Sequence, residues 1–369
     1  MFSPLVIRNI RCPYPIVQGG MGVGVSLAPL AGAVARAGGM GTISSACLDR
    51  LVGRRMGRPV GAREAAAIEV AEAKTGSGGG PVAMNVMVAI QEAFADSVLG
   101  AMDGGADAIV SGAGLPLNLP AVAARHPRAS EVALIPIVSS ARALRILCRR
   151  WKAHGRLPDA VVVEGPLAGG HLGWKRPEEV HDPRHRLENL VDEVLEEAGR
   201  HGGFPVIAAG GVYDRADIEA MLSRGAAGVQ MGTRFLATRE SSASQAYKEA
   251  VVRCRASDIE VAVEPGSPCG LPFRVLRHSP MYRQVREGAR GARCDKGYLR
   301  IGGSCPAASR PDRYFCICNG LLSSAGYDPE KEPPLYTVGA NAHRVDRILS
   351  VAELMAELVG AAMPAAACA

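Results

Sequence analysis

Aromatic residues are scarce in this sequence: Phe, Trp and Tyr together make up 4% of its 369 residues. Surfaces that bind nucleic acid usually combine dense Lys and Arg runs with interleaved aromatic residues, and no stretch of this chain has both. The formal net charge of +6 is small for a chain of this length. An ordinary solvated surface accounts for it, although a phosphate-bearing cofactor or an anionic substrate would suit it equally well. We therefore expect no nucleic-acid partner.

Long apolar runs are also absent. No segment of 18 or more consecutive apolar residues occurs, whereas a helix that crosses a bilayer needs about 20. The first residues, MFSPLVIRNI, lack the basic stretch and the long apolar run of a signal peptide. The ten cysteines would stay reduced in the cytosol. We expect a cytoplasmic protein without a membrane partner.

Aliphatic residues and glycine dominate instead, with hydrophobic residues at 48% and 44 glycines. Eight short β-rich segments recur, each followed by an Ala- or Leu-rich stretch. The intervening stretches, such as 26–39 and 215–226, have helical spacing and close with glycine, which is typical of helix C-termini. The eight predicted strands are 15–20, 41–45, 81–86, 107–114, 135–140, 159–165, 205–211 and 227–233.

Two architectures share this alternation of strands and helices: a (β/α)8 barrel and a doubly wound open sheet. Eight units in about 235 residues match the usual size of the barrel. Nearly every predicted strand also ends in glycine or a polar residue, and in a barrel all of these ends meet at one mouth, where active sites lie. We predict an α/β fold, a (β/α)8 TIM barrel with a smaller irregular or helical C-terminal lobe.

The pattern changes after the eighth predicted strand. We assign residues 1–240 to the barrel, 241–363 to the C-terminal lobe and 364–369 to a tail. More finely, we expect a helix over 239–260, an irregular segment rich in Gly, Pro, Arg and Cys over 264–335, and one or two helices over 344–363.

Two inserts interrupt the regular spacing of the barrel. Residues 54–80 fill the long gap between the second and third predicted strands, and residues 175–190 follow the turn after the sixth. Each insert is either a surface helix or an excursion that faces the substrate.

Glycines stand at the ends of the last two predicted strands. Gly210 and Gly211 end the seventh strand, and Gly232 with Thr233 ends the eighth. In β/α barrels the loops after these strands often bind a phosphate through backbone N–H groups, which glycine leaves accessible because it has no Cβ. Thr233 would add a hydroxyl donor. The alternative is that these glycines only form tight turns.

A further glycine-rich segment, VQGGMGVGVS, includes the end of the first predicted strand. Its glycines do not follow the G-x-G-x-x-G spacing of a dinucleotide fingerprint, and no acidic residue stands where the ribose would need one. The segment would still allow a flat ring system to lie against the backbone at the mouth of the barrel.

His171 is the one histidine that follows a predicted strand, in VVVEGPLAGGHLGW (161–174). Its loop contains Gly169 and Gly170, so it is flexible enough to point into the mouth. Imidazole titrates near neutral pH and is the commonest general acid or base in enzymes. A structural or surface role is the alternative, but the position at the mouth favours catalysis.

Four motifs occur in order: PIVQGGMG, AGGHLG, PVIAAGGV and GVQMGTRF. With them the sequence resembles the nitronate monooxygenase (2-nitropropane dioxygenase) family, which shares a flavin-barrel superfamily with the FMN-dependent enoyl-acyl-carrier-protein reductases. The resemblance is strong over residues 10–240, weak in SDIEVAVEPGSPCGLPFRVL (257–276) and YFCICNGLL, and clearer again in GANAHRVDRILSVAELMAEL. It specifies the superfamily and does not separate its members.

The resemblance implies one non-covalently bound FMN at the mouth of the barrel. Gly20 and Met21 would line the flavin ring, with Asn85 and Gly169 beside it. Nitronate-oxidising members often have glutamine where this chain has Glu164, so a carboxylate near the flavin is a departure that bears on the substrate. The ribityl chain and the phosphate would be held by Gly211, Gln230, Met231, Gly232 and Thr233.

The resemblance also implies the chemistry. In nitroalkane-using members the histidine that matches His171 removes the proton α to the nitro group; the flavin is then reduced by the nitronate and reacts with dioxygen. The first hypothesis is therefore an FMN-dependent nitronate monooxygenase. The alternative is an enoyl-thioester reductase of fatty-acid or polyketide synthesis that uses NAD(P)H. A third hypothesis is a flavin-binding or degenerate barrel that serves as a partner protein, and a homodimer is compatible with all three.

Four cysteines of the C-terminal lobe, Cys294, Cys305, Cys316 and Cys318, follow a C-x10-C-x10-C-x-C spacing. Four thiolates could bind zinc or an iron–sulfur cluster. A close C-x2-C pair is missing, however. Reduced thiols packed in the lobe are the favoured interpretation, and we expect no metal.

Overall fold

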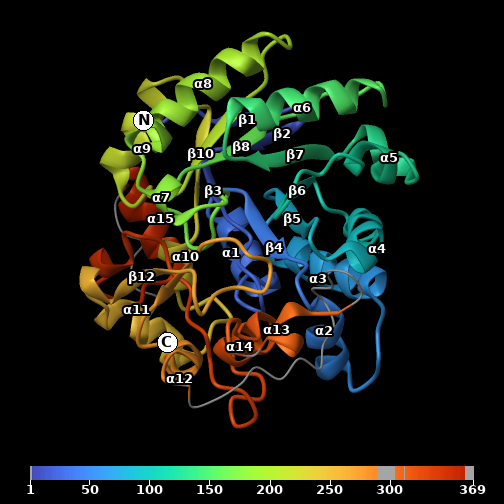
Figure 1. Cartoon of the computed structure of the whole chain (residues 1–369). Helices are drawn as coiled ribbons and strands as arrows, with labels where there is room; N and C mark the ends of the chain where they lie inside the picture. The colour runs from blue at the N-terminus through green and yellow to red at the C-terminus, as the bar shows by residue number, and fades with distance from the viewer. Residues whose placement is uncertain (1, 289–303, 311, 362–369) are drawn as a thin grey trace.

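The computed structural model describes residues 2–288, 304–310 and 312–361 (Figure 1). Eight parallel strands form one sheet in the order β3-β11-β10-β8-β7-β6-β5-β4. All eight predicted strands are present: β3 Ile16–Gln18, β4 Gly41–Ser44, β5 Val82–Met87, β6 Ala108–Gly112, β7 Ala133–Val138, β8 Val161–Glu164, β10 Val206–Ala209 and β11 Gly228–Met231.

The sheet closes on itself. Strand β3, the first of the eight, pairs with β11, the last, and a parallel bridge between Val17 and Met40 joins β3 to the chain that enters β4. The strand order follows the sequence around the ring and has no reversal point, which a doubly wound sheet would need. The predicted (β/α)8 TIM barrel is confirmed, and the open-sheet alternative is wrong.

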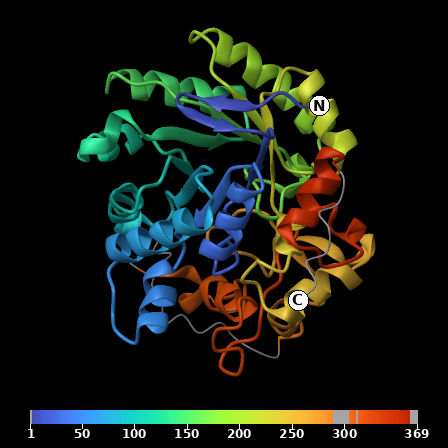
Figure 2. The same cartoon turned by 180° about the vertical axis from the view of Figure 1, so that it is seen from behind.

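Helices surround the barrel (Figures 1 and 2). The eighth outer position is taken by α15 Val351–Val359, which comes from near the end of the chain and contacts α1 and α9. The helix that directly follows the eighth strand, α10 Thr233–Leu236, is too short for that role. The helices between the first and the last barrel strand are, in chain order, α1 Ala28–Arg36, α2 Leu48–Met56, α3 Ala62–Gly76, α4 Gln91–Asp103, α5 Leu119–Ala123, α6 Ala141–Lys152, α7 Pro177–Val180, α8 Leu187–Gly199 and α9 Arg215–Ser223.

A β-hairpin closes the N-terminal end of the barrel. Strands β1 Leu5–Ile7 and β2 Ile10–Cys12 are antiparallel, and alternate side chains are buried, as expected of a sheet with one face on the core. The buried side chains join the apolar residues that fill the barrel interior. At the turn, Arg8 forms an ion pair of 2.8 Å with Asp159. Because this end is filled, a site has room only at the opposite, C-terminal end of the strands.

A second, antiparallel sheet includes the His171 turn. It has the order β12-β13-β9, with β12 Ile259–Ala262, β13 Phe273–Leu276 and β9 Gly170–His171. The helix predicted over 239–260 is therefore wrong in its last part, because α11 covers only Gln245–Arg253 and a strand begins at Ile259. The β-branched residues of this stretch suit a strand once a partner strand is available.

The rest of the lobe is less irregular than its composition predicts. Among the described residues between 264 and 335 there are three short helices: α12 Pro280–Arg286, α13 Pro306–Ser309 and α14 Ile317–Ser324. The predicted tail 364–369 and Cys294 lie outside the described residues. Within the described ranges no group of three or more His, Cys, Asp or Glu side chains is placed to hold a metal ion. None of the described helices has both the length and the apolar character that a bilayer crossing needs.

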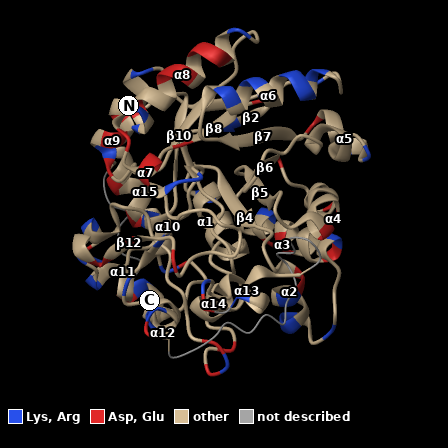
Figure 3. Ribbon diagram, viewed as in Figure 1, with Lys and Arg blue, Asp and Glu red and all other residues tan. Residues whose placement is uncertain are grey.

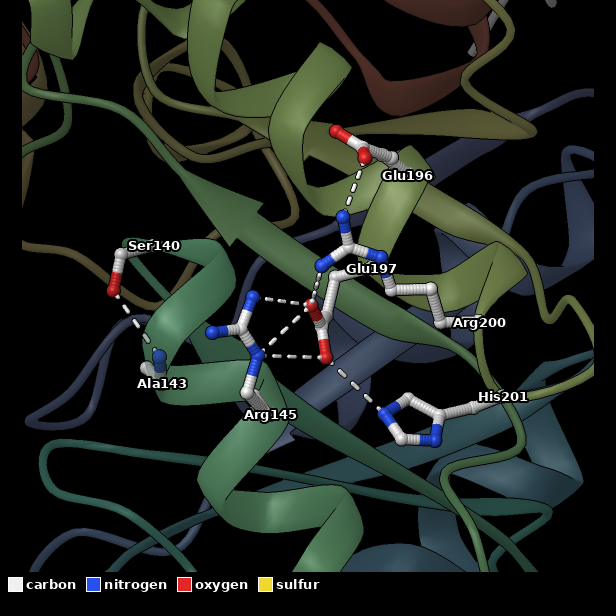
Figure 4. A network of polar contacts seen from close by, with 7 residues as sticks. All are labelled: Ser140, Ala143, Arg145, Glu196, Glu197, Arg200 and His201. Atoms are coloured by element: carbon white, nitrogen blue, oxygen red, sulfur yellow. Dashed lines mark hydrogen bonds and ion pairs between the residues drawn. The ribbon is translucent and has the colours of Figure 1, made fainter.

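Helices α6 and α8 lie side by side with opposite charges (Figure 3). Their central contact is Glu197 of α8, whose side chain is 3% exposed. Arg145 of α6 donates hydrogen bonds of 2.8–3.2 Å to both of its carboxylate oxygens, and Arg200 donates one of 3.1 Å (Figure 4). His201 Nε2 lies 3.2 Å from the same carboxylate. These interactions, led by the Arg145 hydrogen bonds, hold the pKa of Glu197 below its ordinary value, so the group is an anion at neutral pH.

We expect Glu197→Ala to lower the free energy of unfolding by about 2–3 kcal/mol, because it removes the buried carboxylate to which Arg145 and Arg200 donate charged hydrogen bonds. The loss should shrink as the pH falls, since protonation of the carboxylate in wild type removes the same interaction. Urea unfolding of both variants at several pH values measures this. The matched control is Glu196→Ala, whose exposed pair with Arg200 should contribute less than about 1 kcal/mol. Equal losses in both variants would contradict the assignment.

Candidate active site

A cavity of about 1460 Å³ opens at the C-terminal ends of the barrel strands. It exceeds the roughly 300–1,000 Å³ of a typical single-ligand site, so it has room for a cofactor together with a substrate. Every residue that the sequence analysis placed in the site lines it: Gly20, Met21, Asn85, Glu164, Gly169, His171, Gly211, Gln230, Met231, Gly232 and Thr233. The fold thus brings together residues from several strand ends; their individual roles remain predictions.

The loop after β3 is held by a buried polar network. Gln18 Nε2 donates to Ser26 Oγ at 2.9 Å, Gln18 Oε1 accepts from Thr42 N at 2.9 Å, and Met21 N donates to Ser26 Oγ at 2.9 Å. The backbone of Gly20 lies against Asn85 so closely that a Cβ on Gly20 would be 2.4 Å from Asn85 Cβ. The network therefore fixes the loop after β3 beside Asn85.

The C-terminal lobe contacts the wall of the cavity that follows β10 and β11. Thr233 Oγ1 accepts a hydrogen bond of 2.9 Å from Gly339 N, and Asn341 Nδ2 donates one of 2.5 Å to Gly211 O. A Cβ on Gly169 would lie 2.7 Å from the carbonyl carbon of Val338. Sequence reasoning did not name the cavity-lining residues Val338, Gly339 and Asn341, although the renewed resemblance in GANAHRVDR was a signal for them.

The residues present fit a cofactor with a flat ring and a polar chain. Gln230 Oε1 is buried and has no hydrogen-bond partner among the described residues. Buried polar atoms are almost always satisfied, so a ligand atom is a natural partner for this one. On the same wall Gly211, which lines the cavity, has a φ of +108°, a conformation that glycine adopts without strain. A flavin with its ribityl phosphate matches this combination.

Glu164 stands at the end of β8 with its carboxyl group in the cavity. No described residue forms a hydrogen bond or an ion pair with it, and burial raises its pKa to about 7. The group is therefore poised to gain or lose a proton near neutral pH, which glutamine at this position could not do.

We expect Glu164→Gln to change how stability depends on pH. The carboxyl group binds its proton more tightly when folded, so it stabilises the flavin-free protein below about pH 4.5 and loses this contribution as the pH rises to about 7. The contribution is at most about 3 kcal/mol. Urea unfolding of the flavin-free protein from pH 4 to 8 should show a slope that Glu164→Gln removes. An unchanged slope would mean that Glu164 is ionised throughout.

His171 is held by the second sheet. Its backbone pairs with Phe273 of β13, whose ring meets the imidazole edge to face at a centroid distance of 4.7 Å. Its Nε2 lies 2.7 Å from Ser267 Oγ and 2.8 Å from Cys269 Sγ. Burial lowers the pKa of His171 to about 4, so the imidazole is neutral at physiological pH and able to accept a proton.

A buried arginine fixes the loop that leads to His171. Arg274 of β13 is 4% exposed and donates a hydrogen bond of 2.7 Å to the carbonyl oxygen of Pro166 and a second one to that of Ala168. Burial lowers its pKa to about 10, which still leaves it charged. Sequence reasoning did not name Ser267, Cys269 and Arg274, although the weak resemblance in SDIEVAVEPGSPCGLPFRVL covered all three.

The insert at 175–190 also reaches the cavity. Lys175, Arg176 and Arg184 line it, together with Arg142 at the start of α6. Arg176 and Arg184 are paired with acidic neighbours within the insert. Lys175 and Arg142 form no ion pair with any described residue, so they are the cations available to an anionic ligand at the mouth. Of the two interpretations of this insert, a surface helix or an excursion that faces the substrate, its position at the cavity favours the second.

Comparisons with known proteins agree with this geometry. The sequence model of the nitronate monooxygenase family matches residues 3–360. A (3aS,4S,5R,7aS)-5-hydroxy-7a-methyl-1-oxo-octahydro-1H-indene-4-carboxyl-CoA dehydrogenase of Mycobacterium tuberculosis is 32% identical over 86% of this chain and 78% of that protein. The nitronate monooxygenase of Pseudomonas aeruginosa is 40% identical over 32% of this chain and 33% of its own.

Solved structures show the same fold. FabK from Thermotoga maritima superposes with a TM-score of 0.69 and 26% identity, covering 95% of this chain and 92% of that one. Nitroalkane oxidase from Streptomyces ansochromogenes gives a TM-score of 0.67 at 23% identity over 95% of both chains. Together, the barrel, the flavin-sized cavity and the match along nearly the whole chain lead to one assignment: the protein is a flavin-dependent oxidoreductase that belongs to the nitronate monooxygenase family.

Proposed function

We propose that this protein oxidises nitroalkanes and their nitronates with dioxygen, using FMN held in the cavity and His171 as the general base. The observation that carries the proposal is the neutral imidazole of His171, which lines the cavity and has a depressed pKa. A neutral nitroalkane needs a base to lose the proton α to its nitro group, and imidazole is suited to that role.

Residues of the chain itself supply binding and positioning. Gly20 and Asn85 would hold the flavin ring, and Gln230 would donate to or accept from a polar atom of the flavin or its chain. Gly211, Gly232 and Thr233 would surround the phosphate, with Asn341 securing the backbone of Gly211. Bound FMN would take electrons from the deprotonated substrate and pass them to dioxygen.

A second candidate function is oxidation or reduction of the carbon–carbon bond next to the carbonyl group of a thioester. It is favoured by the coenzyme A-linked relative, which aligns with 86% of this chain. The cations Lys175 and Arg142 at the mouth would suit the phosphates of such a carrier. The same base would act on the proton α to the thioester carbonyl, with NAD(P)H as electron donor if the reaction runs as a reduction.

Anaerobic reduction of the purified holoenzyme distinguishes these functions. Bleaching of the flavin by propyl nitronate, with turnover in air, is the result that we expect. Bleaching by NADPH without nitronate turnover would reject the first candidate in favour of enoyl-thioester reduction, and bleaching by a saturated acyl-CoA would favour dehydrogenation. A colourless protein that takes up no FMN would reject all of them and favour a partner-protein role.

A further inference from the structure

The imidazole of His171 is held from one side by two side chains of the same loop. Nε2 lies 2.7 Å from Ser267 Oγ and 2.8 Å from Cys269 Sγ, and these two atoms are 2.9 Å apart. Ser267 Oγ also accepts a long hydrogen bond of 3.4 Å from Cys269 N. The three polar atoms therefore form a closed triangle, with one nitrogen of the imidazole at its apex.

This triangle lies behind the imidazole as seen from the cavity. His171 lines the cavity, whereas Ser267 and Cys269 are not among its lining residues. Both belong to the loop between β12 and β13, and Ser267 is 1% exposed. No described residue forms a hydrogen bond with Nδ1 of His171. The ring thus turns Nε2 toward the protein and leaves Nδ1 for a substrate.

Burial favours the neutral form of each group in the triangle. It lowers the pKa of His171 to about 4 and raises the pKa of the Cys269 thiol, so neither carries a charge at neutral pH. A neutral imidazole has one N–H and one acceptor nitrogen, and the partner of one nitrogen decides which of them keeps the proton. If Nε2 carries the proton, the unprotonated Nδ1 faces the cavity and can act as a base. If Nδ1 carries the proton, the nitrogen that faces the cavity is a hydrogen-bond donor.

We propose that Ser267 and Cys269 form an acceptor pair that holds the proton on Nε2 of His171, which makes Nδ1 the atom that removes the substrate proton. The proposal rests on the proposed role of His171 as base. Nε2–H donates to Ser267 Oγ, and the Ser267 hydroxyl donates to Cys269 Sγ. When Nδ1 takes a proton from the substrate carbon, the positive charge on the ring strengthens the Nε2–H bond to this pair. Ser267 and Cys269 are thus positioning residues.

Nitrogen NMR of the holoenzyme tests the tautomer directly. Long-range ¹H–¹⁵N correlation of protein labelled on histidine, with His171 assigned by comparison with His171→Gln, separates the protonated ring nitrogen from the unprotonated one. We expect Nε2 to carry the proton in wild type and the two tautomers to become mixed in the Ser267→Ala/Cys269→Ala double variant. A proton on Nδ1 in wild type would overturn the proposal.

Kinetics with two substrates provide the second readout. We expect the double variant to lose about 10- to 100-fold in kcat on a neutral nitroalkane, part of the 10²- to 10⁴-fold that a positioned base contributes. Turnover of pre-formed nitronate, which needs no proton removal, should stay within about twofold. Cys269→Ser keeps an acceptor and should retain most of the activity. The matched control Cys254→Ala removes a buried thiol outside the cavity and should change neither rate.

Different results would reject His171 as the base and Ser267 with Cys269 as the acceptor pair. Full nitroalkane activity in His171→Gln would reject the base, while the NMR result would still report the tautomer. Full activity in the double variant, or equal losses on nitroalkane and nitronate, would reject the acceptor pair even if His171 proves essential.

Discussion

Replacement of His171 by glutamine is expected to lower kcat/KM on a neutral nitroalkane by about 10²- to 10⁴-fold, the usual contribution of a positioned general base. Glutamine keeps a polar side chain of similar length next to Ser267 and Cys269, but it cannot accept the substrate proton. Activity on pre-formed nitronate should remain within a few-fold of wild type. Steady-state oxygen consumption with both substrates measures the difference.

The control for this variant is His278→Gln, because His278 is an exposed histidine that lies outside the cavity and pairs with Asp258. It should leave both activities unchanged. Flavin content should be the same in all three proteins. Equal losses on nitroalkane and nitronate in His171→Gln would show that the histidine has another role, such as substrate binding.

The pH profile of wild type adds to this test. Because burial lowers the pKa of His171 to about 4, the base should stay unprotonated down to about that pH. A further transition near pH 7 would then belong to Glu164, whose pKa burial raises to about 7. Glu164→Gln should abolish the transition near pH 7 and leave the one near pH 4.

Gly20→Ala is expected to weaken FMN binding by at least about tenfold, which is about 1.4 kcal/mol. The new Cβ would be 2.4 Å from Asn85 Cβ, an atom close to the backbone that cannot swing away as the end of a flexible side chain could. Either Asn85 or the loop after β3 must move, and both line the predicted position of the flavin ring. Fluorescence titration of flavin-free protein with FMN gives the affinity.

Gly61→Ala is the matched control for this variant. Nothing lies within 4 Å of a Cβ at Gly61, and its φ of −82° suits any residue. It should bind FMN as wild type does. If Gly20→Ala also kept wild-type affinity, the flavin ring would have to lie elsewhere in the cavity.

The sequence by itself determined the barrel. The barrel strands are short runs rich in aliphatic residues and most of the outer helices are longer, so their type depends on local spacing that a single sequence displays. The polar or glycine residues at the strand ends are local signals as well. For that reason the sequence alone places Asn85, Glu164 and Gln230 at the mouth of the barrel, and the cavity contains all three.

Only the tertiary structure decided what surrounds His171. Local spacing predicts the end of a helix where strand β12 begins, because the preference of this stretch for extended backbone is expressed only when β13 and β9 complete the sheet. Ser267 and Cys269 reach the imidazole from 96 and 98 residues further along the chain. Contacts across such separations depend on how the whole chain folds back, and no local periodicity records them. The position of the histidine was therefore readable in the sequence, whereas the groups that control its proton were not.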